Sequence, residues 1–449
     1  MLHADIHTVD DDGTADFTTI QSAVDAAVDG DEIQVLPGVY RGNGSEVVNL
    51  LGKRLRVRSL QGPAVTTIDG EGLRRCLVAT GGETIATSLE GFTISNGQGL
   101  WVDLDGDGNP GELEVIGGGV MLLSSRPRFV DCIFRQNSAK TGGAVHARNA
   151  RATFLRCSFL ENEAVVGGAM SNNEGSSAII TNCSFGYNLA PKGGAIENRT
   201  GSDGQITNSS FEGHFSISGS CILNVGVSPV ISQCTFNNNS SSRGGAIYDT
   251  SSSASLIRSC SFVENSATQD GGAVGAFASS TRIENCIFRQ NNAGAAGGAV
   301  HGDTTSQLEI TGSTFDRNRA LFGGAVSNAS GSTSVLSDCR FERNRAELDG
   351  GSVNSDSSSL ARIGGSTMCG SFPDFIQGTW IDESGNQFFS TCSTNSDLDG
   401  DGLVGGADLL ILLSDWGPCP TSSQCAGDID ENGLVDGNDL LLLLAEWNG

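Results

Sequence analysis

The chain repeats itself with a period of 25 to 27 residues over more than half of its length. The tripeptide Gly-Gly-Ala begins at Gly142, Gly167, Gly193, Gly244, Gly271, Gly297 and Gly323, and weaker copies begin at Gly117, Gly219 and Gly350. A fixed period of this length means that each repeat is one structural unit, which buries its apolar face only against its neighbours. The repeat therefore predicts a solenoid.

A second motif, Phe-x-x-Asn, keeps the same period. Its copies are Phe134/Asn137, Phe159/Asn162, Phe185/Asn188, Phe236/Asn239, Phe262/Asn265, Phe288/Asn291, Phe315/Asn318 and Phe341/Asn344. Two residues before these Phe residues the chain carries Cys132, Cys157, Cys183, Cys234, Cys260, Cys286 and Cys339, or a serine (Ser209, Ser313). The segments alternate as strands do and lack helical spacing. They predict coils of three short strands stacked into an all-β, right-handed parallel β-helix.

The stacking predicts a specific interior. Equivalent positions of neighbouring coils stand about 4.8 Å apart, so Phe should stack on Phe and Asn on Asn. An inward Asn ladder can satisfy buried backbone groups at a turn, and Gly-Gly supplies a turn that a Cβ would obstruct. The Cys ladder is predicted to hold buried thiols, since stacked Cβ vectors run parallel. Two pairs could form bridges: Cys369 with Cys392 and Cys419 with Cys425.

The rival architecture is the leucine-rich repeat. Phe154-x-x-Cys157-x-Phe159-x-x-Asn162 is similar to its first half. The second half of that repeat needs a helical segment, and Gly-Gly-Ala-Val followed by Ser, Asn and Gly is poor helix material. The β-helix is therefore preferred.

Phe-x-x-Asn alternating with Gly-Gly-Ala resembles the repeats of polymorphic outer-membrane proteins, over about 117–355. The segment Phe17–Tyr40 carries Ile20, Ala23, Val24 and Ala27 at helical spacing before a strand and a turn. It resembles the N-terminal cap and first coil of pectinesterases and related pectin-lyase-like proteins. Residues 31–365 would make about 12 coils of about 26 residues. The aromatic residues between Cys369 and Cys392 are expected to form a lid on an irregular closing loop.

Composition excludes two classes of partner. The chain has 26 Lys and Arg against 52 Asp and Glu, for a net charge of −26. Nucleic acid and anionic membrane surfaces need cationic partners, so neither is expected. The longest apolar runs, Leu409–Leu413 and Leu440–Ala445, are too short to span a bilayer. The start at Met1 shows no secretory signal.

Two acidic twelve-residue loops near the C-terminus predict calcium sites. Residues 397–408 and 428–439 place carboxylate or amide oxygens at loop positions 1, 3, 5 and 12, with Gly at position 6. Ca²⁺ binds six to eight such oxygens. The predicted ligands are Asp397, Asp399, Asp401, Leu403 (through its carbonyl) and Asp408 in the first loop, and Asp428, Asp430, Asn432, Leu434 (carbonyl), Asp436 and Asp439 in the second.

Each of these loops runs into a Leu-rich segment that ends in Trp, and the two copies lie 31 residues apart. Residues 396–449 resemble a type I dockerin, which implies a small α-helical calcium-binding domain. The resemblance also implies a cohesin-like partner. Loop positions 10 and 11 are Gly406-Ala407 and Gly437-Asn438, where cellulosomal dockerins commonly carry Ser-Thr-like contact residues.

A third acidic loop occupies residues 103–114 and matches the same calcium pattern. Its predicted ligands are Asp103, Asp105, Asp107, Asn109 and Glu114. The sequence then divides into 1–96 (cap helix and first coils), 97–116 (calcium-loop insertion), 117–365 (repeat β-helix), 366–395 (C-terminal cap and linker) and 396–449 (dockerin-like domain).

One row of residues offers candidates for acid/base chemistry. The position after Gly-Gly-Ala-Val is predicted to point outward, and there or next to it lie His146, Glu197, Tyr248, Asp249 and His301. Such residues could form a sugar-binding or acid/base groove. The alternative is ordinary solvated surface, and no residues match the pectinesterase catalytic set.

Two functions follow. The first is a secreted or cell-surface, calcium-binding β-helix that acts as an adhesion or scaffold protein and contacts glycans or proteins. The second is a polysaccharide lyase or glycoside hydrolase delivered by its dockerin-like tail. Calcium-dependent loops place either protein outside the cytoplasm, because extracellular calcium is plentiful enough to fill them.

Overall fold

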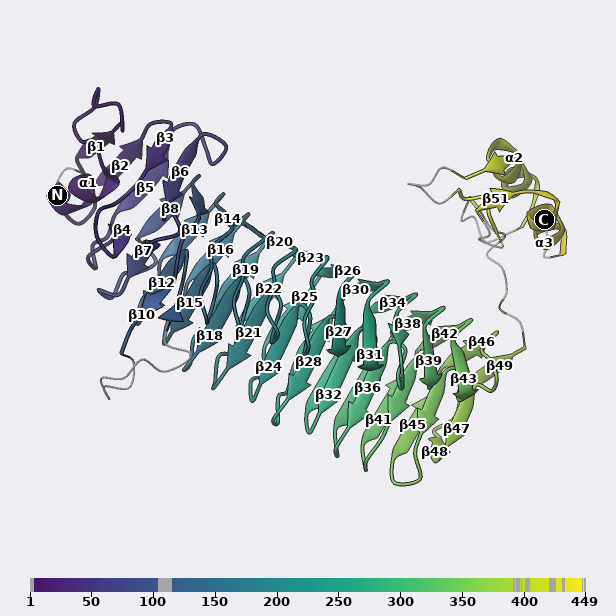
Figure 1. The fold of residues 1–449 in the computed structure, drawn as a ribbon. Helices are drawn as coiled ribbons and strands as arrows, with labels where there is room; N and C mark the ends of the chain where they lie inside the picture. The colour runs from purple at the N-terminus through teal and green to yellow at the C-terminus, as the bar shows by residue number, and fades with distance from the viewer. Residues whose placement is uncertain are drawn as a thin grey trace. The chain divides into compact units, whose positions relative to one another are not determined.

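The computed structural model describes residues 4–103, 115–390, 392, 396, 398–399, 404–419, 425–429, 433–445 and 447. It separates into two compact units, Met1–Phe388 and Phe389–Gly449, which are described separately. The first unit is a long stack of coils, drawn from purple to green in Figure 1. The second is a small helical unit.

Each coil contributes one strand to each of three parallel sheets, here called A, B and C. In one coil the chain passes from β28 (Ile247–Thr250) in sheet C to β29 (Leu256–Arg258) in sheet A and β30 (Ser261–Val263) in sheet B. The next coil repeats this path in register, so that Ile247 pairs with Val274 and Phe262 with Phe288. The predicted parallel β-helix is confirmed.

Sheet A contains β1 (Ile6–Val9), β2 (Glu32–Val35), β5 (Arg56–Ser59), β8 (Ser88–Glu90), β13 (Arg128–Val130), β16 (Thr153–Leu155), β19 (Ile179–Thr181), β22 (Gln205–Thr207), β25 (Val230–Ser232), β29, β33 (Ser280–Glu284), β37 (Gln307–Thr311), β41 (Thr333–Ser337), β45 (Leu360–Gly364) and β48 (Trp380–Asp382). Sheet B contains β3 (Gly38–Tyr40), β6 (Thr66–Asp69), β9 (Thr93–Ser95), β14 (Ile133–Arg135), β17 (Ser158–Leu160), β20 (Ser184–Gly186), β23 (Ser210–Glu212), β26 (Thr235–Asn237), β30, β34 (Ile287–Arg289), β38 (Thr314–Asp316), β42 (Arg340–Glu342), β46 (Thr367–Cys369) and β49 (Gln387–Phe389).

Sheet C contains β4 (Glu46–Asn49), β7 (Arg75–Ala79), β12 (Val120–Leu123), β15 (Val145–Arg148), β18 (Met170–Asn173), β21 (Ile196–Arg199), β24 (Ile222–Val225), β28, β32 (Val274–Phe277), β36 (Val300–Asp303), β40 (Val326–Asn328), β44 (Val353–Ser355) and β47 (Ile376–Gly378). A shorter sheet D lies between sheets B and C along the chain. It contains β27 (Ser240–Arg243), β31 (Ser266–Asp270), β35 (Asn292–Ala293), β39 (Arg319–Phe322) and β43 (Arg345–Asp349).

The solenoid is longer than the predicted 12 coils. Within the described residues, sheets A, B and C have 15, 14 and 13 strands, which makes about 14 turns. The extra strands come from the two ends. β1 precedes the first predicted coil, and β47, β48 and β49 form where the sequence predicts an irregular closing loop. Phe375 and Trp380 of this segment pack against the core and cover its end.

The predicted Phe ladder fills the interior. From Phe134 to Phe341, successive rings of the row stack with centroids 4.6 to 4.9 Å apart and planes within 8° of parallel. Phe211 takes the place of the Phe that the repeat requires between Phe185 and Phe236. These rings are fully buried, so each one buries its apolar faces against the rings of the neighbouring coils.

The Asn ladder runs beside the Phe ladder at the turn that follows sheet B. Where an Asn is followed by an Asn in the next coil, its Nδ2 donates to the Oδ1 of that Asn at 2.9 to 3.0 Å. It also donates to a Phe carbonyl, as Asn265 does to Phe236. Because each Oδ1 accepts a backbone N–H in return, the buried turn keeps its polar groups paired.

The Cys ladder is also confirmed as a row of buried thiols. Each Sγ donates to the carbonyl two residues earlier, and the backbone N–H of Cys234 donates to the Sγ of Cys260. Ser209 makes the same two contacts with its hydroxyl, which explains why Ser replaces Cys in the row. Nine cysteines are free and buried. Cys419 and Cys425 are bridged, and Cys369 and Cys392 are also disulfide-bonded.

The predicted cap helix forms and ends just before Ala27, the last of its predicted apolar positions. α1 spans Ile20–Ala26, its N-cap Thr19 accepts the N–H of Ser22, and Ile20, Ala23 and Val24 cover the first coils. The insertion leaves the solenoid through β10 (Leu100–Trp101) and returns through β11 (Val115–Ile116), which pair antiparallel. In the described part of the chain, every helix is too short or too polar to cross a lipid bilayer.

The second unit repeats one loop–helix element twice. α2 (Gly406–Ser414) and α3 (Gly437–Ala445) pack through Leu412 and Leu443, with Val404 and Val435 beside them. Each member of these pairs lies 31 residues from its counterpart, as predicted from the duplicated loops. β50 (Gly417–Pro418) and β51 (Leu434–Val435) pair antiparallel between the two halves.

Candidate functional site

The row that the sequence predicts to be exposed lies on the outer side of sheet C, in the predicted order. Tyr248 pairs with Gly275, and Gly275 pairs with His301, so Tyr248 and His301 stand two coils apart. Their side chains are not solvated, however. Tyr248 is 9% exposed and His301 6%, and His146 and Glu197 are still more buried.

The Gly-Gly turn causes this burial. Gly244 has φ +59°, and a Cβ built there would lie 2.2 Å from the carbonyl oxygen of Ile247 and 3.0 Å from the Cβ of Tyr248. The turn therefore closes directly against the outer side of the strand. The Tyr248 ring also lies against Gly275, where a Cβ would come within 2.9 Å of Cδ2. The outer row is thus packed between its turns and its own neighbours.

Asp249 points the other way, into the solenoid. A ladder of amides from Asn172 through Asn198 and Asn224 ends on its Oδ1, at 2.8 Å from Asn224 Nδ2. Ser255 and Thr281 also donate to Asp249, which is fully buried. Burial raises the pKa of its carboxyl, and the three donors oppose that rise. Asp249 therefore closes an internal ladder and does not line an outer groove.

Glu197 and His146 lie apart from the Tyr248–His301 pair. Glu197 contacts Arg199, with Nε 3.0 Å from Oε1, and accepts from Ser171 at 3.2 Å. Burial raises the pKa of this carboxyl, and Arg199 opposes the rise. Neither ring nitrogen of His146 has a hydrogen-bond partner among the described residues, and burial lowers its pKa to about 3. The structure does not bring the five predicted residues into one site.

A smaller polar cluster surrounds Tyr248 and His301. It consists of Arg243, Tyr248, Asp270, His301 and Asp303, which line a hollow of about 10 Å³. Burial lowers the pKa of His301, and Asp270 and Asp303 oppose this effect. Burial raises the pKa of Tyr248, and Arg243 opposes it. The hollow has room for about one water molecule and none for a sugar ring.

The carboxylates of this cluster do not belong to the predicted row. Asp270 directly precedes the glycines of one repeat, and Asp303 lies two residues beyond His301. The position before Gly-Gly is the signal that could have identified Asp270, since the turn places it beside the outer row. Arg243 occupies the same position one coil earlier.

An open groove follows the corner between sheets A and B. It has a volume of about 660 Å³ and is lined by Arg156, Cys157, Ser158, Asn182, Cys183, Ser184, Asn208, Ser209, Ser210, Gln233 and Thr235. Four of these residues form the bends between sheets A and B in successive coils, with φ between +50° and +55°: Arg156, Asn182, Asn208 and Gln233. Bends of this kind favour Asn, which explains part of the row. Apart from Arg156 and two thiols, the lining consists of amides and hydroxyls, and it contains no carboxylate.

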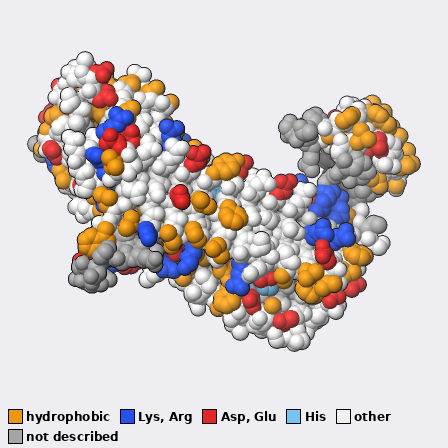
Figure 2. Space-filling view, in the orientation of Figure 1, with side chains coloured by type: hydrophobic (Ala, Val, Ile, Leu, Met, Phe, Trp, Pro, Cys, Tyr) orange, Lys and Arg blue, Asp and Glu red, His pale blue; other side chains and the backbone are white. Residues whose placement is uncertain are grey.

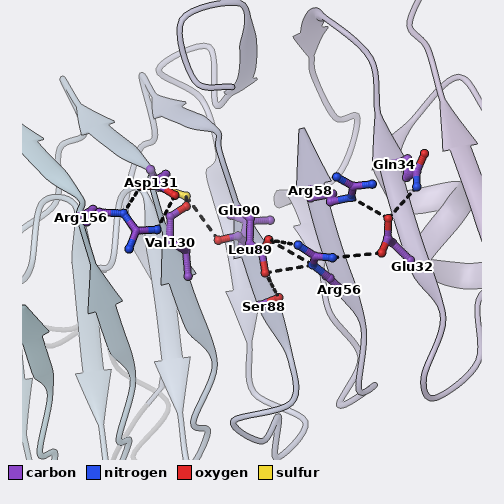
Figure 3. Close-up of polar contacts among 11 residues, drawn as sticks. Glu32, Gln34, Arg56, Arg58, Ser88, Leu89, Glu90, Val130, Asp131 and Arg156 are labelled. Carbon is purple, nitrogen blue, oxygen red and sulfur yellow. Dashed lines mark hydrogen bonds and ion pairs between the residues drawn. The ribbon is translucent and has the colours of Figure 1, made fainter. Parts of the chain in front are cut away.

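Charged side chains close the groove toward the N-terminus. Arg156 donates to both carboxylate oxygens of Asp131 at 2.7 Å (Figure 3). Further along the outer side of sheet A, Arg56 bridges Glu90 and Glu32, and Arg58 also contacts Glu32 (Figure 3). These charges are paired with one another, so they form a structural ladder between coils and leave the amide groove as the open polar surface.

The tail carries the described part of the predicted calcium loops. Asp408, at loop position 12, is buried at the start of α2, and its Oδ1 accepts the backbone N–H of Asp399 at loop position 3 (3.1 Å). The two ends of the first loop therefore converge. In the second loop Asp428 accepts the N–H of Gly433, whose φ is +88° as the predicted sharp turn requires. Asp439, the counterpart of Asp408, is also buried and accepts from Asp436.

Several predicted ligands lie outside the described residues. These are Asp397, Asp401, Leu403, Asp430 and Asn432 in the tail, and Asp105, Asp107, Asn109 and Glu114 in the insertion. Asp103 is the one predicted ligand of the insertion that lies within the described residues. Within the described ranges alone, no three His, Cys, Asp or Glu side chains gather as a metal site. The oxygen donors of the tail loops fit a hard cation such as Ca²⁺, and the converging loop ends agree with that fit.

Comparison with known proteins supports the fold. Residues 167–344 match the family model of the right-handed β-helix region, which also agrees with the predicted handedness. No curated protein matches the chain. Similar solved structures include pectin methylesterase from carrot (14% identity, 62% of this chain and 82% of that chain, TM-score 0.34). They also include tailspike protein 3 of bacteriophage CBA120 (12%, 83% and 58%, 0.34) and PfbA, a surface adhesin of Streptococcus pneumoniae (10%, 82% and 87%, 0.36). Likeness of this degree concerns the β-helix alone.

Proposed function

We propose that the protein is an extracellular or cell-surface β-helix that binds glycans, with a calcium-binding tail that serves docking. The observation that carries this proposal is the open amide and hydroxyl groove at the corner of sheets A and B. The residues best suited to acid/base chemistry are instead buried and divided among separate contacts.

The groove has the chemistry of a sugar-binding surface. Asn, Gln, Ser and Thr side chains both donate and accept hydrogen bonds, as sugar hydroxyls do. They recur at about 4.8 Å from coil to coil, a spacing comparable to the length of one pyranose ring. An extended glycan lying along the solenoid would therefore meet one set of partners per sugar.

A glycan array with paired variants tests this proposal. Asn182→Gly with Asn208→Gly removes two amides from the groove, and glycine retains the positive φ of each bend. Asn285→Gly is the matched control, because Asn285 occupies the same bend row outside the groove. We expect the double variant to lose glycan binding and the control to keep it. Equal binding by all three proteins would refute the groove as the site.

The second candidate function is a polysaccharide-degrading enzyme. The cluster of Tyr248, His301, Asp270 and Asp303 is its candidate site, because it joins groups that can exchange protons, although its hollow of about 10 Å³ takes no sugar ring. Release of reducing ends or unsaturated uronides from a glycan panel, abolished by His301→Ala, would establish this function in place of the first.

The tail loops support the calcium part of the proposal by their donor set and their 31-residue duplication. A cohesin-like protein or another cell-surface component is the proposed partner of this tail. Pull-down of such a partner by the full chain in calcium, and its loss in chelator, tests the docking role.

A further inference from the structure

One face of the solenoid carries a ladder of residues just after sheet B, in which Ser240 and Ser266 are half-buried and the other six members are exposed. Its members pair from coil to coil in the order Leu189, Phe215, Ser240, Ser266, Asn292, Arg319, Arg345 and Phe372. Seven register steps of about 4.8 Å make it about 34 Å long. We call these eight residues the outer ladder.

Two exposed aromatic side chains lie at the start of the outer ladder, one of them a member and one beside it. Phe215 is 63% exposed, and the neighbouring Tyr187 is 62% exposed. The Tyr187 ring lies against Gly213, where a Cβ would come within 2.4 Å of Cε1, so the ring is held close to the surface of the next coil. Figure 2 shows hydrophobic side chains gathered on this face over β20 and β23. Flat, exposed rings of this kind are suited to stack on sugar rings.

Near its other end the outer ladder runs through an arginine patch, defined as Arg319 and Arg345 of the ladder with the neighbouring Arg289, Arg317, Arg340 and Arg343. These are six of the 26 basic residues of a chain with a net charge of −26. Three carboxylates contact the patch, namely Asp316, Glu342 and Glu347, which leaves an excess of three positive charges. Figure 2 shows Lys and Arg side chains gathered near β42, on the same face as the hydrophobic side chains over β20 and β23.

The six arginines of the patch share three carboxylates, and Arg345 lies over the ring of Phe372, 5.8 Å from its centroid. Arg319 and Arg345 pair directly in register, although like charges opposite each other destabilise a sheet. The Nε atoms of Arg289 and Arg343 are buried and make no hydrogen bond among the described residues, and both lie near the one carboxylate of Asp316, at 3.4 and 3.7 Å. An anion laid across neighbouring guanidinium groups would relieve the repulsion and use these donors.

We propose that the outer ladder binds an anionic glycan, with its rings on Tyr187 and Phe215 and its carboxylate or sulfate groups on the arginine patch. Ser240, Ser266 and Asn292 would offer uncharged polar partners to the stretch between. The inference rests on the proposed glycan-binding function and adds a second surface and the charge of the ligand. Nucleic acid is the less suitable polyanion, because its dense phosphates would be repelled by the acidic remainder of the chain.

Three polymers with one backbone test the proposal on the full chain: dextran, carboxymethyl dextran and dextran sulfate. We expect the charged dextrans to bind more tightly than dextran, with added salt weakening them. Arg319→Gln with Arg345→Gln should weaken the charged dextrans about tenfold, corresponding to two charge-assisted contacts, and leave dextran unchanged. Preference for the carboxymethyl or the sulfate polymer identifies the acidic group.

The matched control is Arg282→Gln with Arg362→Gln, which removes two exposed, ion-paired arginines from the outer side of sheet A. It should bind all three polymers as the wild type does. Phe215→Ala should weaken charged dextrans while the groove variants do not. Equal loss in both arginine pairs, no loss in either, or tighter binding of single-stranded DNA than of dextran sulfate would overturn the inference. Binding of neutral glycans through the groove would then still leave the proposed function standing, whereas a protein that binds no glycan fails both.

Discussion

Nδ2 of Asn188 lies 3.2 Å from Nε2 of His214, at the one coil where the Asn ladder is interrupted between Asn188 and Asn239. His214 occupies the Asn position, and its backbone N–H donates to Asn239 Oδ1 as an Asn would. Burial lowers the pKa of His214 to about 4. The ladder therefore contains one member that must stay neutral for the turn to remain buried.

This arrangement predicts acid sensitivity that His214→Asn removes. The unfolded chain binds a proton at His214 below about pH 6.5, whereas the folded chain binds it only near pH 4, so stability falls as the pH drops through this window. The loss reaches roughly 3 kcal/mol for a pKa difference of this size. Urea titrations at pH 7.5 and pH 4 measure it. If wild type and variant lose the same stability between these pH values, His214 is not the source.

The Phe ladder predicts a large effect from a single truncation. Phe236→Ala removes a fully buried ring stacked between Phe211 and Phe262 and should destabilise the solenoid by about 3–5 kcal/mol. The exposed Phe215→Ala serves as its control and should change stability by less than about 1 kcal/mol. Denaturant titration measures both, and similar values for the two variants would contradict the ladder.

The Cys ladder predicts that Ser replaces Cys better than Ala does. Ser209 shows that a hydroxyl can donate to the carbonyl two residues earlier and accept the N–H of the preceding coil. Cys234→Ser should therefore be less destabilising than Cys234→Ala by about 1 kcal/mol, because Ala removes the side-chain donor of the Ser232 carbonyl, which then keeps only the backbone N–H of Asn208. Thermal unfolding of the two variants measures the difference, and a more stable Ala variant would contradict the hydrogen-bonding role of the Cys234 thiol.

The same ladder predicts the thiol content of the protein. Nine cysteines are free and four are disulfide-bonded. Titration with a thiol reagent should give nine thiols in denaturant without reductant and close to none in the native state, because burial shields them. A count of one or fewer in denaturant would show that the ladder is oxidised.

Chelation should unfold the tail and spare the solenoid. The tail has a small core, and its loops gather carboxylates that repel one another without a cation. Calcium binding would add its free energy to the folded tail. Calorimetry of the full chain should show a transition that shifts with calcium, while the β-sheet signal is unchanged. Asp428→Ala should lose one of the tail sites, and a tail that melts identically in calcium and chelator would refute the calcium loops.

Much of this architecture could be predicted because the same motifs recur in many copies of the repeat. Phe134, Asn137 and Cys132 recur at one period, and a stacked solenoid is the arrangement in which a ring, an amide and a thiol can each meet their own copies. The duplicated tail was predictable for the same reason, since Asp408 and Asp439 begin equivalent helices.

The candidate site depended on information that no single repeat contains. The sequence indicates that His146, Glu197, Tyr248 and His301 share a row, but whether that row meets solvent depends on how closely the turns at Gly244 and Gly297 approach it. Likewise, Asp249 and Tyr248 are neighbours in sequence, yet a strand directs them to opposite sides of the sheet.

The sequence by itself thus determined the coil, its ladders and the spacing of oxygen ligands in the tail loops. Identical residues at a fixed period can only meet one another when the coils stack in register, so the repeat alone specifies the ladders. Only the tertiary structure decided which side chains are open to a ligand. Phe215, Arg319 and Arg345 each directly follow the Asn position of a repeat, so the repeat places them in one row, but only the packing of the turns leaves their side chains exposed. Exposure is a property of the packed turns, and no local pattern encodes it.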